Sequence, residues 1–395
     1  MEKPNLKEAT PMDPNLGDTS KLDQVTFFIS LTLLPNFQEI TCPYRVEDPS
    51  KPWPIILWLQ GGPGASGVGI GNFQEVGPLD TFLNPRNSTW LKKADLLFVD
   101  SPVGAGYSFV EENQKELYVK SDEEAAEDLT KLLQQLFNKK QTLNQSPLFI
   151  VAESYGGKIA VKLGLSVFEL VKSGKLKLHL GGVVLGDSWI SPEDFVDFYN
   201  FLLDSGMDPV SLTTSLEMKK QNRIKKYSSY LNGLRSLSDV KEGEEGEEGD
   251  LNTLMNGVIK KKLKIIPKDL IWGNNSNDVF AAMYAAFMKP VIEDVDELLA
   301  KGINVTIYNG QLDVICSTSG TEAWVHKLKW GGLEEFKNME RKPLYCESDK
   351  ATRGFTKSYK NLHFYWILGA GHFVPVDEPC VALNMVGEIT KSPQL

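Results

Sequence analysis

A serine in a glycine-rich turn is the first residue of this sequence that could act as a nucleophile. Residues 148–157 read LFIVAESYGG, so an apolar, β-branched run ends at Ser154 and glycines follow. Helical apolar spacing comes next, at Ile159, Leu163, Val167 and Leu170. A sharp turn from strand to helix exposes a serine hydroxyl at the carboxyl end of the strand and points the helix N-terminus at any anion there. Ser154 is therefore the candidate nucleophile.

The pattern around Ser154 matches the G-x-S-x-G turn imperfectly. Ala152 occupies the first glycine position, and Gly156 fills the second. A serine before glycines is also an ordinary turn residue or helix cap, and this reading stays open. The position between a buried strand and a helix favours the catalytic reading.

A serine hydroxyl needs a nearby base, and four histidines are available: His179, His326, His363 and His372. Only His372, in the glycine loop 369–375 (GAGHFVP), follows the last predicted strand. In hydrolases with this type of turn, the acid follows the penultimate strand and precedes the histidine. Asp313, which ends the segment INVTIYNGQLD, fits that position, and Asp187 is the rival acid.

Acyl transfer also needs amide donors for the oxygen that becomes negative. The amide of Tyr155 follows the nucleophile, and Gly62 lies in a glycine loop, WLQGGPGAS at 58–66, after the first strong strand. A phosphate-binding loop would carry the Walker lysine, which is missing here. We therefore expect Gly62 and Tyr155 to form an oxyanion hole.

These residues need a sheet whose strands end at one edge. Short apolar runs predict buried strands over residues 54–60, 95–99, 148–152, 182–185, 305–308 and 363–368. Helical patterns lie between them, and Ser121 to Glu124 (SDEE) fits a capping box. The sequence thus predicts an α/β fold with a mostly parallel, mixed central sheet and helices on both faces. Residues 191–300 lose the strand rhythm and predict a helical cap insertion, with an acidic disordered loop at 241–250.

Composition excludes several functions. With 52 acidic and 42 basic residues the formal net charge is −10, which disfavours nucleic acid and anionic membranes as partners. No apolar run reaches the roughly 18 residues of a membrane span. The cysteines are scattered and form no C-x-x-C pair, so we expect no metal site and no cofactor; they are Cys42, Cys316, Cys346 and Cys380.

Motifs in order along the chain resemble the serine carboxypeptidase family of α/β-hydrolases. The resemblance is strongest to its retinoid-inducible-like and plant serine carboxypeptidase-like members. It covers roughly residues 45–390 through WLQGGPGAS (58–66), FQEVGP (73–78), FVDSPVGAGYSF (98–109), AESYGG (152–157), GDSWISP (186–192), NGQLDVIC (309–316) and GAGHFVP (369–375). The hydrolase core would then span 45–190 and 301–395, either side of the cap.

The resemblance implies a function and a set of residues. The enzyme would release C-terminal residues from peptides or proteins through an acyl-serine intermediate, with a triad of Ser154, Asp313 and His372. Gln60, Glu153 and the amide of Gly61 would grip the free C-terminal carboxylate, with Glu75 supporting Glu153. A carboxyl beside another carboxyl can keep a proton and donate it, so activity is expected to be best in mild acid. Glu153 could instead simply complement the positive end of the helix dipole.

Two other functions remain open at this stage. A serine carboxypeptidase-like acyltransferase would use the same triad to pass the acyl group from an activated ester to an alcohol. A catalytically impaired protein would keep the fold only for binding. No motif fixes the oligomeric state or the side-chain specificity. The triad does not distinguish water from an alcohol as the acyl acceptor, but the carboxylate-gripping residues favour the peptidase.

The chain also departs from the family. Gln60 replaces the commoner Asn, and Ala65 replaces a cysteine that is disulfide-bonded in many members. Cys316 is then expected to be a thiol near the pocket, and Cys346–Cys380 is a candidate disulfide. Residues 1–44 are atypical, because the family starts with a signal peptide that leads into the first strands of the sheet.

The compartment is predicted from conflicting signals. Sequons stand at Asn87, Asn144, Asn274 and Asn304, about twice the number expected by chance, and they favour glycosylation on the secretory route. The family implies a secreted, vacuolar or lysosomal enzyme. The polar, acidic N-terminal segment lacks the basic region and apolar core of a signal peptide, so retention in the cytosol is the alternative.

Overall fold

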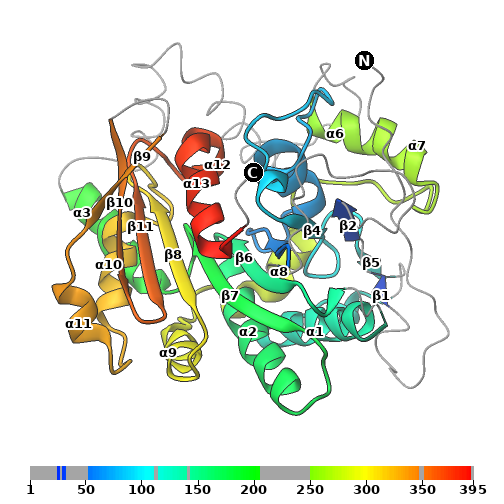
Figure 1. Ribbon diagram of the computed structural model, residues 1–395. Helices are drawn as coiled ribbons and strands as arrows, with labels where there is room; N and C mark the ends of the chain where they lie inside the picture. The colour runs from blue at the N-terminus through cyan, green and yellow to red at the C-terminus, as the bar shows by residue number, and fades with distance from the viewer. Residues whose placement is uncertain are drawn as a thin grey trace.

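A mixed nine-stranded sheet forms the centre of the computed structural model, in the order β2-β4-β3-β6-β7-β8-β11-β10-β9 (Figure 1). The structure describes residues 25–26, 29–32, 52–110, 114–139, 143–204, 250–346 and 351–392, the first two ranges by backbone only. Within these ranges, β4, β3, β6, β7, β8 and β11 run parallel, whereas β2, β10 and β9 are antiparallel to their neighbours. The predicted α/β fold with a mostly parallel sheet is confirmed.

The strands match the predicted positions closely. Their bounds are β1 Val25–Thr26, β2 Ile29–Thr32, β3 Ile55–Leu59, β4 Asp95–Val99, β5 Phe109–Val110, β6 Pro147–Glu153, β7 His179–Gly186, β8 Val305–Gly310, β9 Lys342–Tyr345, β10 Thr352–Tyr359 and β11 Leu362–Ile367. The hairpin of β9 and β10 was not predicted, because its alternating residues are only partly buried.

The helices lie mainly between the strands. Their bounds are α1 Asp122–Lys139, α2 Gly156–Lys172, α3 Pro192–Asp204, α6 Leu251–Leu254, α7 Lys260–Leu263, α8 Asn277–Phe287, α9 Ile292–Ala300, α10 Thr318–His326, α11 Leu333–Asn338, α12 Val374–Asp377 and α13 Pro379–Thr390. Short 3₁₀ turns cover Trp90–Lys92 (η3) and Lys115–Leu117 (η4), and wider π turns cover Gly67–Val76 (η2) and Met255–Ile259 (η6). Among the described residues, no helix combines the length and apolarity that a membrane crossing needs.

Two hydrophobic cores cover the two faces of the sheet. In β3, Ile55, Leu57 and Leu59 belong to one core, and Ile56 and Trp58 belong to the other. The first core includes residues of α1, α2, α9 and α10, and the second includes residues of η2 and α13. Alternate side chains of a strand point to opposite faces, so a strand buried on both faces reads as a continuous apolar run, as this one does.

The first crossover helix begins where the capping pattern predicts. The Glu124 amide donates to Ser121 Oγ at 3.2 Å, and the Glu124 carboxylate accepts from the Lys120 amide at 2.8 Å. The reciprocal contact thus falls one residue earlier than in a standard capping box. Leu129, Leu133 and other apolar residues of α1 are then buried against α2.

The region predicted as a cap is helical where it is described. Helices α3, α6, α7 and α8 lie in it, and α9 packs on α2 and β8, next to the sheet. The acidic repeat lies outside the described residues apart from Asp250, which caps α6 by accepting from the Thr253 amide. The cap boundaries at 191 and 300 therefore stay a prediction. In the atypical N-terminal segment, the backbone of β2 pairs with β4 and covers the edge of that strand.

Candidate active site

The carboxyl ends of four adjacent parallel strands bring the candidate residues to one edge of the sheet. Ser154 follows β6, Asp187 follows β7, Asp313 lies beyond β8 and His372 lies beyond β11. These strands are neighbours in that order. Ligands of open α/β sheets bind outside the carboxyl ends of the strands, so this edge is the expected position of a site.

Ser154 adopts the strained turn of an exposed nucleophile. Its φ is +56°, in the left-handed region that costs most residues roughly 1–2 kcal/mol. The Ser154 amide donates to the Gly186 carbonyl at 3.1 Å, and its carbonyl accepts from the Trp189 amide at 2.9 Å. Hydrogen bonds to the β7 end thus hold the strained conformation, and Ala152 at the first glycine position is buried without disturbing it.

Asp313 and His372 form a buried pair. The Asp313 carboxylate accepts from His372 Nδ1 at 2.8 Å through Oδ2, and through Oδ1 it accepts from the amides of Ile315 at 2.8 Å and Cys316 at 3.1 Å. With Nδ1 donating to the carboxylate, Nε2 is the ring nitrogen that can accept a proton. Among the described residues, no direct hydrogen bond joins Ser154 Oγ to the His372 ring. Such contacts often tighten only when a substrate binds.

The glycine loop after β3 lies against the Ser154 hydroxyl. A Cβ added to Gly61 would stand 2.9 Å from Ser154 Oγ and 3.1 Å from the Tyr155 amide nitrogen. Gly62 has a φ of +107°, which glycine tolerates best. The amide hydrogens of Gly62 and Tyr155 have no acceptor within the described part of the chain, so both are free to bind an oxyanion.

Asp100, which sequence reasoning did not single out, holds this loop from behind. Its Oδ1 accepts from Ser66 Oγ at 2.5 Å and the Val68 amide at 3.1 Å, and its Oδ2 accepts from the Tyr107 amide at 2.9 Å. Burial raises the pKa of Asp100 to about 6. The stretch FVDSPVGAGYSF contains Asp100 and Tyr107, but nothing in the sequence says that the acid faces the other loop.

A buried polar network fixes Tyr155, whose amide is the second candidate oxyanion donor. Its hydroxyl donates to Asp122 Oδ1 at 2.6 Å, and its ring stacks on Phe287 of α8 at 5.7 Å between centroids. Lys158, fully buried, lies 3.1 Å from Asp122 Oδ2 and donates to the Ala286 carbonyl. The network thus joins α1, α2 and α8 beneath the nucleophile.

The predicted carboxylate-binding residues meet beside Ser154. Gln60 Nε2 donates to Glu153 Oε1 at 2.9 Å and to Glu75 Oε1 at 3.1 Å. Trp58 Nε1 donates to Gln60 Oε1 at 2.7 Å, which fixes the orientation of the amide. The second oxygens of both glutamates are buried and have no donor among the described residues.

Burial favours protonation of these glutamates. It raises the pKa of Glu75 to about 7, although side-chain hydrogen bonds with Glu153 and Gln60 oppose this rise. Burial, followed by the charge of Glu75, raises the pKa of Glu153 well above its usual value. A proton on either carboxyl would also allow a hydrogen bond between the two side chains, which lie within reach of each other, since a protonated acid donates where a carboxylate only accepts.

Asp187 does not replace Asp313. It accepts from Asn309 and Gly310 and makes no hydrogen bond to His372 within the described residues. Asp313, not its rival, therefore contacts the imidazole. The other three histidines lie elsewhere: His179 begins β7, His326 ends α10, and His363 bonds Ser358 on the neighbouring strand.

The structure agrees with the expectations for Cys316, Cys346 and Cys380, and Cys42 lies outside the described residues. Cys316 is a free, buried thiol. Its Sγ lies within 4.8 Å of a carboxylate oxygen of Asp313 and of a ring nitrogen of His372. Burial raises the pKa of this thiol well above its usual value, so it stays uncharged. Cys346 and Cys380 form a disulfide between the end of β9 and the first turn of α13.

The sequon asparagines differ in exposure. Asn87 and Asn304 are exposed, although the Asn304 amide donates to the Gly181 carbonyl at 3.1 Å. Asn144 and Asn274 are half-buried; in its better orientation the Asn144 amide donates to two backbone carbonyls, and Asn274 Oδ1 is buried. Asn87 is thus exposed, and its side chain makes no hydrogen bond within the described part of the chain.

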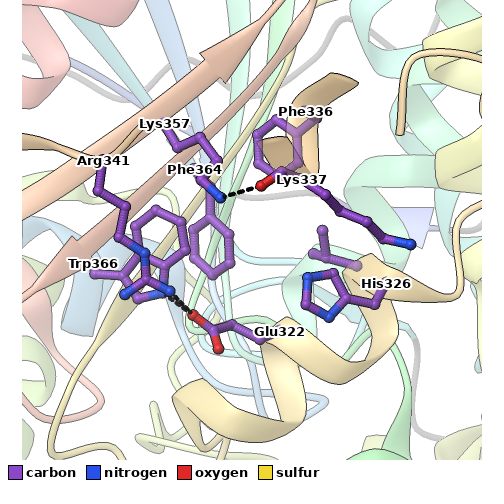
Figure 2. Close-up of a pocket in the computed structure, with 9 residues that line it drawn as sticks. Glu322, His326, Phe336, Lys337, Arg341, Lys357, Phe364 and Trp366 are labelled. Carbon is purple, nitrogen blue, oxygen red and sulfur yellow. Dashed lines mark hydrogen bonds and ion pairs between the residues drawn. The ribbon is translucent and has the colours of Figure 1, made fainter. Parts of the chain in front are cut away.

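A separate pocket lies between α10, α11 and the strands β10 and β11, and it contains none of the predicted site residues (Figure 2). Glu322, Arg341 and Lys357 in its lining already have partners: Glu322 accepts from Arg341 at 2.7 Å and from Trp366 at 2.6 Å, and Lys357 donates to the backbone carbonyl of Lys337 at 3.1 Å. These contacts leave no buried polar group that requires a ligand there.

Comparison with known proteins identifies the family. The serine carboxypeptidase family profile matches residues 44–253 and 246–392. The chain is 76% identical to serine carboxypeptidase-like 51 of Arabidopsis thaliana, across 89% of this chain and 88% of that protein. It is 43% identical to the retinoid-inducible serine carboxypeptidase of Mus musculus, across 88% and 87%. The crystal structure of Kex1(delta)p, a prohormone-processing carboxypeptidase from Saccharomyces cerevisiae, shares the fold, with a TM-score of 0.72 at 20% identity over 96% of this chain and 90% of that one. The chain therefore belongs to the serine carboxypeptidase family of serine hydrolases and has the α/β-hydrolase fold.

Proposed function

We propose that this chain releases C-terminal residues from peptides, with Ser154 as nucleophile, His372 as base and Asp313 as the orienting acid. His372 Nε2 takes the serine proton as Ser154 Oγ attacks the carbonyl carbon of the last peptide bond. The amides of Gly62 and Tyr155 stabilise the oxyanion. The imidazolium then gives its proton to the leaving amine, and water resolves the acyl-serine by the reverse sequence of proton transfers.

The observation that carries the proposal is the carboxyl cluster next to the nucleophile. Gln60 donates to both Glu75 and Glu153, and Glu153 immediately precedes Ser154. An endopeptidase or esterase has no need for buried acids that hold protons at this position. A protonated Glu153, the Gln60 amide and the Gly61 amide would together donate to the carboxylate at the end of a peptide.

This arrangement predicts activity in mild acid. Because burial raises the pKa values of Glu75 and Glu153, the donor form is present at low pH and is lost as the pH rises through those values. The charge on the substrate carboxylate would then meet ionised glutamates, which repel it.

The test compares matched peptides. Purified protein should remove the last residue of a peptide with a free C-terminus at pH 5 and should leave the C-terminally amidated form intact. A fluorophosphonate probe should label the protein, and Ser154→Ala should abolish both labelling and cleavage. Full cleavage of the amidated peptide at pH 8 would contradict the assigned role of the carboxyl cluster, and unlabelled folded protein would contradict the triad.

The same preparation distinguishes the acyltransferase reading. Consumption of an acyl-glucose ester in the presence of an alcohol, without cleavage of any peptide, would show that the acyl-serine is transferred rather than hydrolysed. Retention of the carboxyl cluster favours the peptidase. A disulfide and an exposed sequon at Asn87 support an oxidising, secretory compartment for the mature enzyme; microsomal fractionation with glycosidase treatment tests it.

A further inference from the structure

Asp187 is a buried carboxyl that the proposed reaction does not use. It follows β7, is 0% exposed, and has a φ of +41°, a left-handed conformation that is unfavourable for a residue with a side chain. An unpaired ionised carboxylate in such a place would be costly, because burial penalises charge. The contacts of its two oxygens indicate how the side chain is accommodated.

One oxygen of Asp187 is fully engaged. Oδ1 accepts from Asn309 Nδ2 at 3.0 Å and from the Gly310 amide at 2.8 Å. Asn309 in turn is held by the Cys316 carbonyl at 2.9 Å and by the Thr321 hydroxyl. These contacts fix the orientation of the Asp187 carboxyl and therefore also the position of its Oδ2.

The second oxygen of Asp187 has no partner of its own in the described part of the chain, and the Asp313 carboxyl lies nearby. Oδ2 is buried and finds no donor among the described residues, and the two carboxyl groups are within hydrogen-bonding reach of each other. Titratable groups that interact with Asp187 include Asp377, Glu153, Tyr308 and Cys316, and the His372 ring lies on the other side of Asp313. Burial, followed by the charge of Asp313, raises the pKa of Asp187 well above its usual value.

We propose that Asp187 is a positioning residue that stays protonated and donates a hydrogen bond from Oδ2 to the Asp313 carboxylate, holding that carboxylate against His372. The inference rests on the proposed function, because Asp313 must orient the base. The Asp313 carboxylate would then be held by two backbone amides, one carboxylic acid and the imidazole, which satisfies the acceptor capacity of both oxygens.

Protonation also sets the charge behind the triad. With Asp187 neutral, Asp313 is the charged carboxylate that contacts the imidazole of His372. If Asp187 ionised, its negative charge would repel the Asp313 carboxylate and remove the hydrogen bond that holds it, so the His372 ring would be less well oriented to take the serine proton. The site should therefore lose reactivity when Asp187 ionises.

Two substitutions separate hydrogen bonding from packing. Asp187→Asn keeps an acceptor for Asn309 and Gly310 and supplies a permanent N–H donor to Asp313, so fluorophosphonate labelling of Ser154 should persist at pH 6. Asp187→Leu has a similar size but no donor, and labelling should fall by about tenfold or more, in line with loss of a charge-assisted hydrogen bond. Asp194→Asn, at a buried acid outside the site, is the control and should leave labelling unchanged. Equal labelling rates for the folded Leu variant and the wild type would overturn the proposal.

The pH dependence gives a readout that packing alone would not move. The probe has no carboxylate, so Glu153 does not affect its binding. Labelling of the wild type should decline on the alkaline side, whereas labelling of Asp187→Asn should extend to higher pH. Coincident alkaline limbs would overturn the proposal even if the Leu variant fails to fold.

Infrared spectroscopy tests the proton without reference to activity. Because Glu75 and Glu153 can also absorb as protonated acids, the test is a difference spectrum at pH 7. Wild type minus Asp187→Asn should contain the carbonyl stretch of a protonated carboxylic acid, and wild type minus Asp194→Asn should lack it. Identical spectra for the wild type and Asp187→Asn would show that Asp187 is ionised. A wild-type protein that shows the band but is not labelled by the probe would contradict the proposed function and leave the protonated pair standing.

Discussion

At the residue scale, the site depends on groups whose chemistry changes when they are buried. Glu75 and Glu153 would be ordinary surface acids in water, yet behind the glycine loop both are pushed towards the protonated form. The same residue type can therefore act as a hydrogen-bond donor to a carboxylate, a role that exposed glutamates cannot fill at neutral pH.

Glu153→Gln should remove the pH dependence of peptide binding. A glutamine amide donates at every pH, so the KM for a free-acid peptide should rise little between pH 5 and pH 8, whereas the wild-type KM should rise about tenfold or more over that range. Steady-state kinetics at several pH values checks this. The labelling rate with a fluorophosphonate serves as control, because that probe carries no carboxylate. A KM that rises equally in both proteins would assign Glu153 a purely structural role.

Gly61→Ala should inactivate the enzyme without unfolding it. The added methyl would lie 2.5 Å from the Ser154 Cβ, so the loop would have to move away from the nucleophile. A displacement of about 1 Å in a catalytic group can reduce the rate about a hundredfold. The matched control is Gly257→Ala, where an added Cβ meets nothing within 4 Å. Labelling rates near the wild type in Gly61→Ala would show that the loop is not fixed against Ser154.

At the scale of elements, α1, α2 and α8 share one buried polar network. Lys158, Asp122 and Tyr155 are all within it, and burial lowers the pKa of Lys158. A buried ion pair adds little net stability, but removing one partner leaves an uncompensated charge. The network therefore matters more for the position of α2, and of the Tyr155 amide at its start, than as a source of stability.

Lys158→Met should destabilise the protein by about 3–5 kcal/mol, because it leaves the charge of Asp122 buried without its partner. The double variant Lys158→Met with Asp122→Asn should recover a large part of that loss, since no charge is then left buried. Urea unfolding of the wild type, both single variants and the double variant measures the coupling energy between Lys158 and Asp122. Additive effects in this cycle would mean that the two side chains do not interact.

The sequence predicted the elements better than their contacts. The strand that ends at Ser154 was expected over 148–152 and extends over Pro147–Glu153, because a continuous apolar run bounded by polar residues is a local signal. The contact between Asp313 and His372 could also be predicted, since the order of the strands and the position of the glycine loops leave few candidate acids and histidines. Three contacts could not be predicted: that of Asp100 with the glycine loop, that of Lys158 with Asp122, and that of Asp187 with Asp313. Each joins residues far apart in sequence, and no local pattern encodes that proximity.

At the scale of the whole molecule, buried acids with raised pKa values link folding to pH. The folded chain binds more protons than the unfolded chain when the pH lies between the unfolded and folded pKa of each acid. For Glu75 that window runs from 4.5 to about 7, and for Asp100 from 3.8 to about 6. Stability must therefore increase as the pH falls through this range, which is the opposite of the usual effect of salt-bridged carboxylates.

The melting temperature should be higher at pH 5 than at pH 8. Glu75 alone should make the free energy of unfolding about 2 kcal/mol larger at pH 5 than at pH 8, given the distance between its unfolded and folded pKa values. Scanning calorimetry across this range measures the effect. Glu75→Gln should flatten the curve, and Glu335→Gln, at an exposed acid, should leave it unchanged. Equal melting temperatures at both pH values for the wild type would show that the acids are ionised in the folded state.

The Cys346–Cys380 disulfide turns residues 346–380 into a covalent ring that contains β10, β11 and the loop of His372. The loop cannot swing out on its own, because one side continues from a strand in the sheet and the other is fastened to the end of β9. Backbone amides of β10, β11 and the loop of His372 should exchange with deuterium as one cooperative unit while the bond is intact. After reduction of the disulfide, amides in the segment after His372 should exchange sooner than those of β11. The imidazole should then lose its contact with Asp313 before the sheet opens.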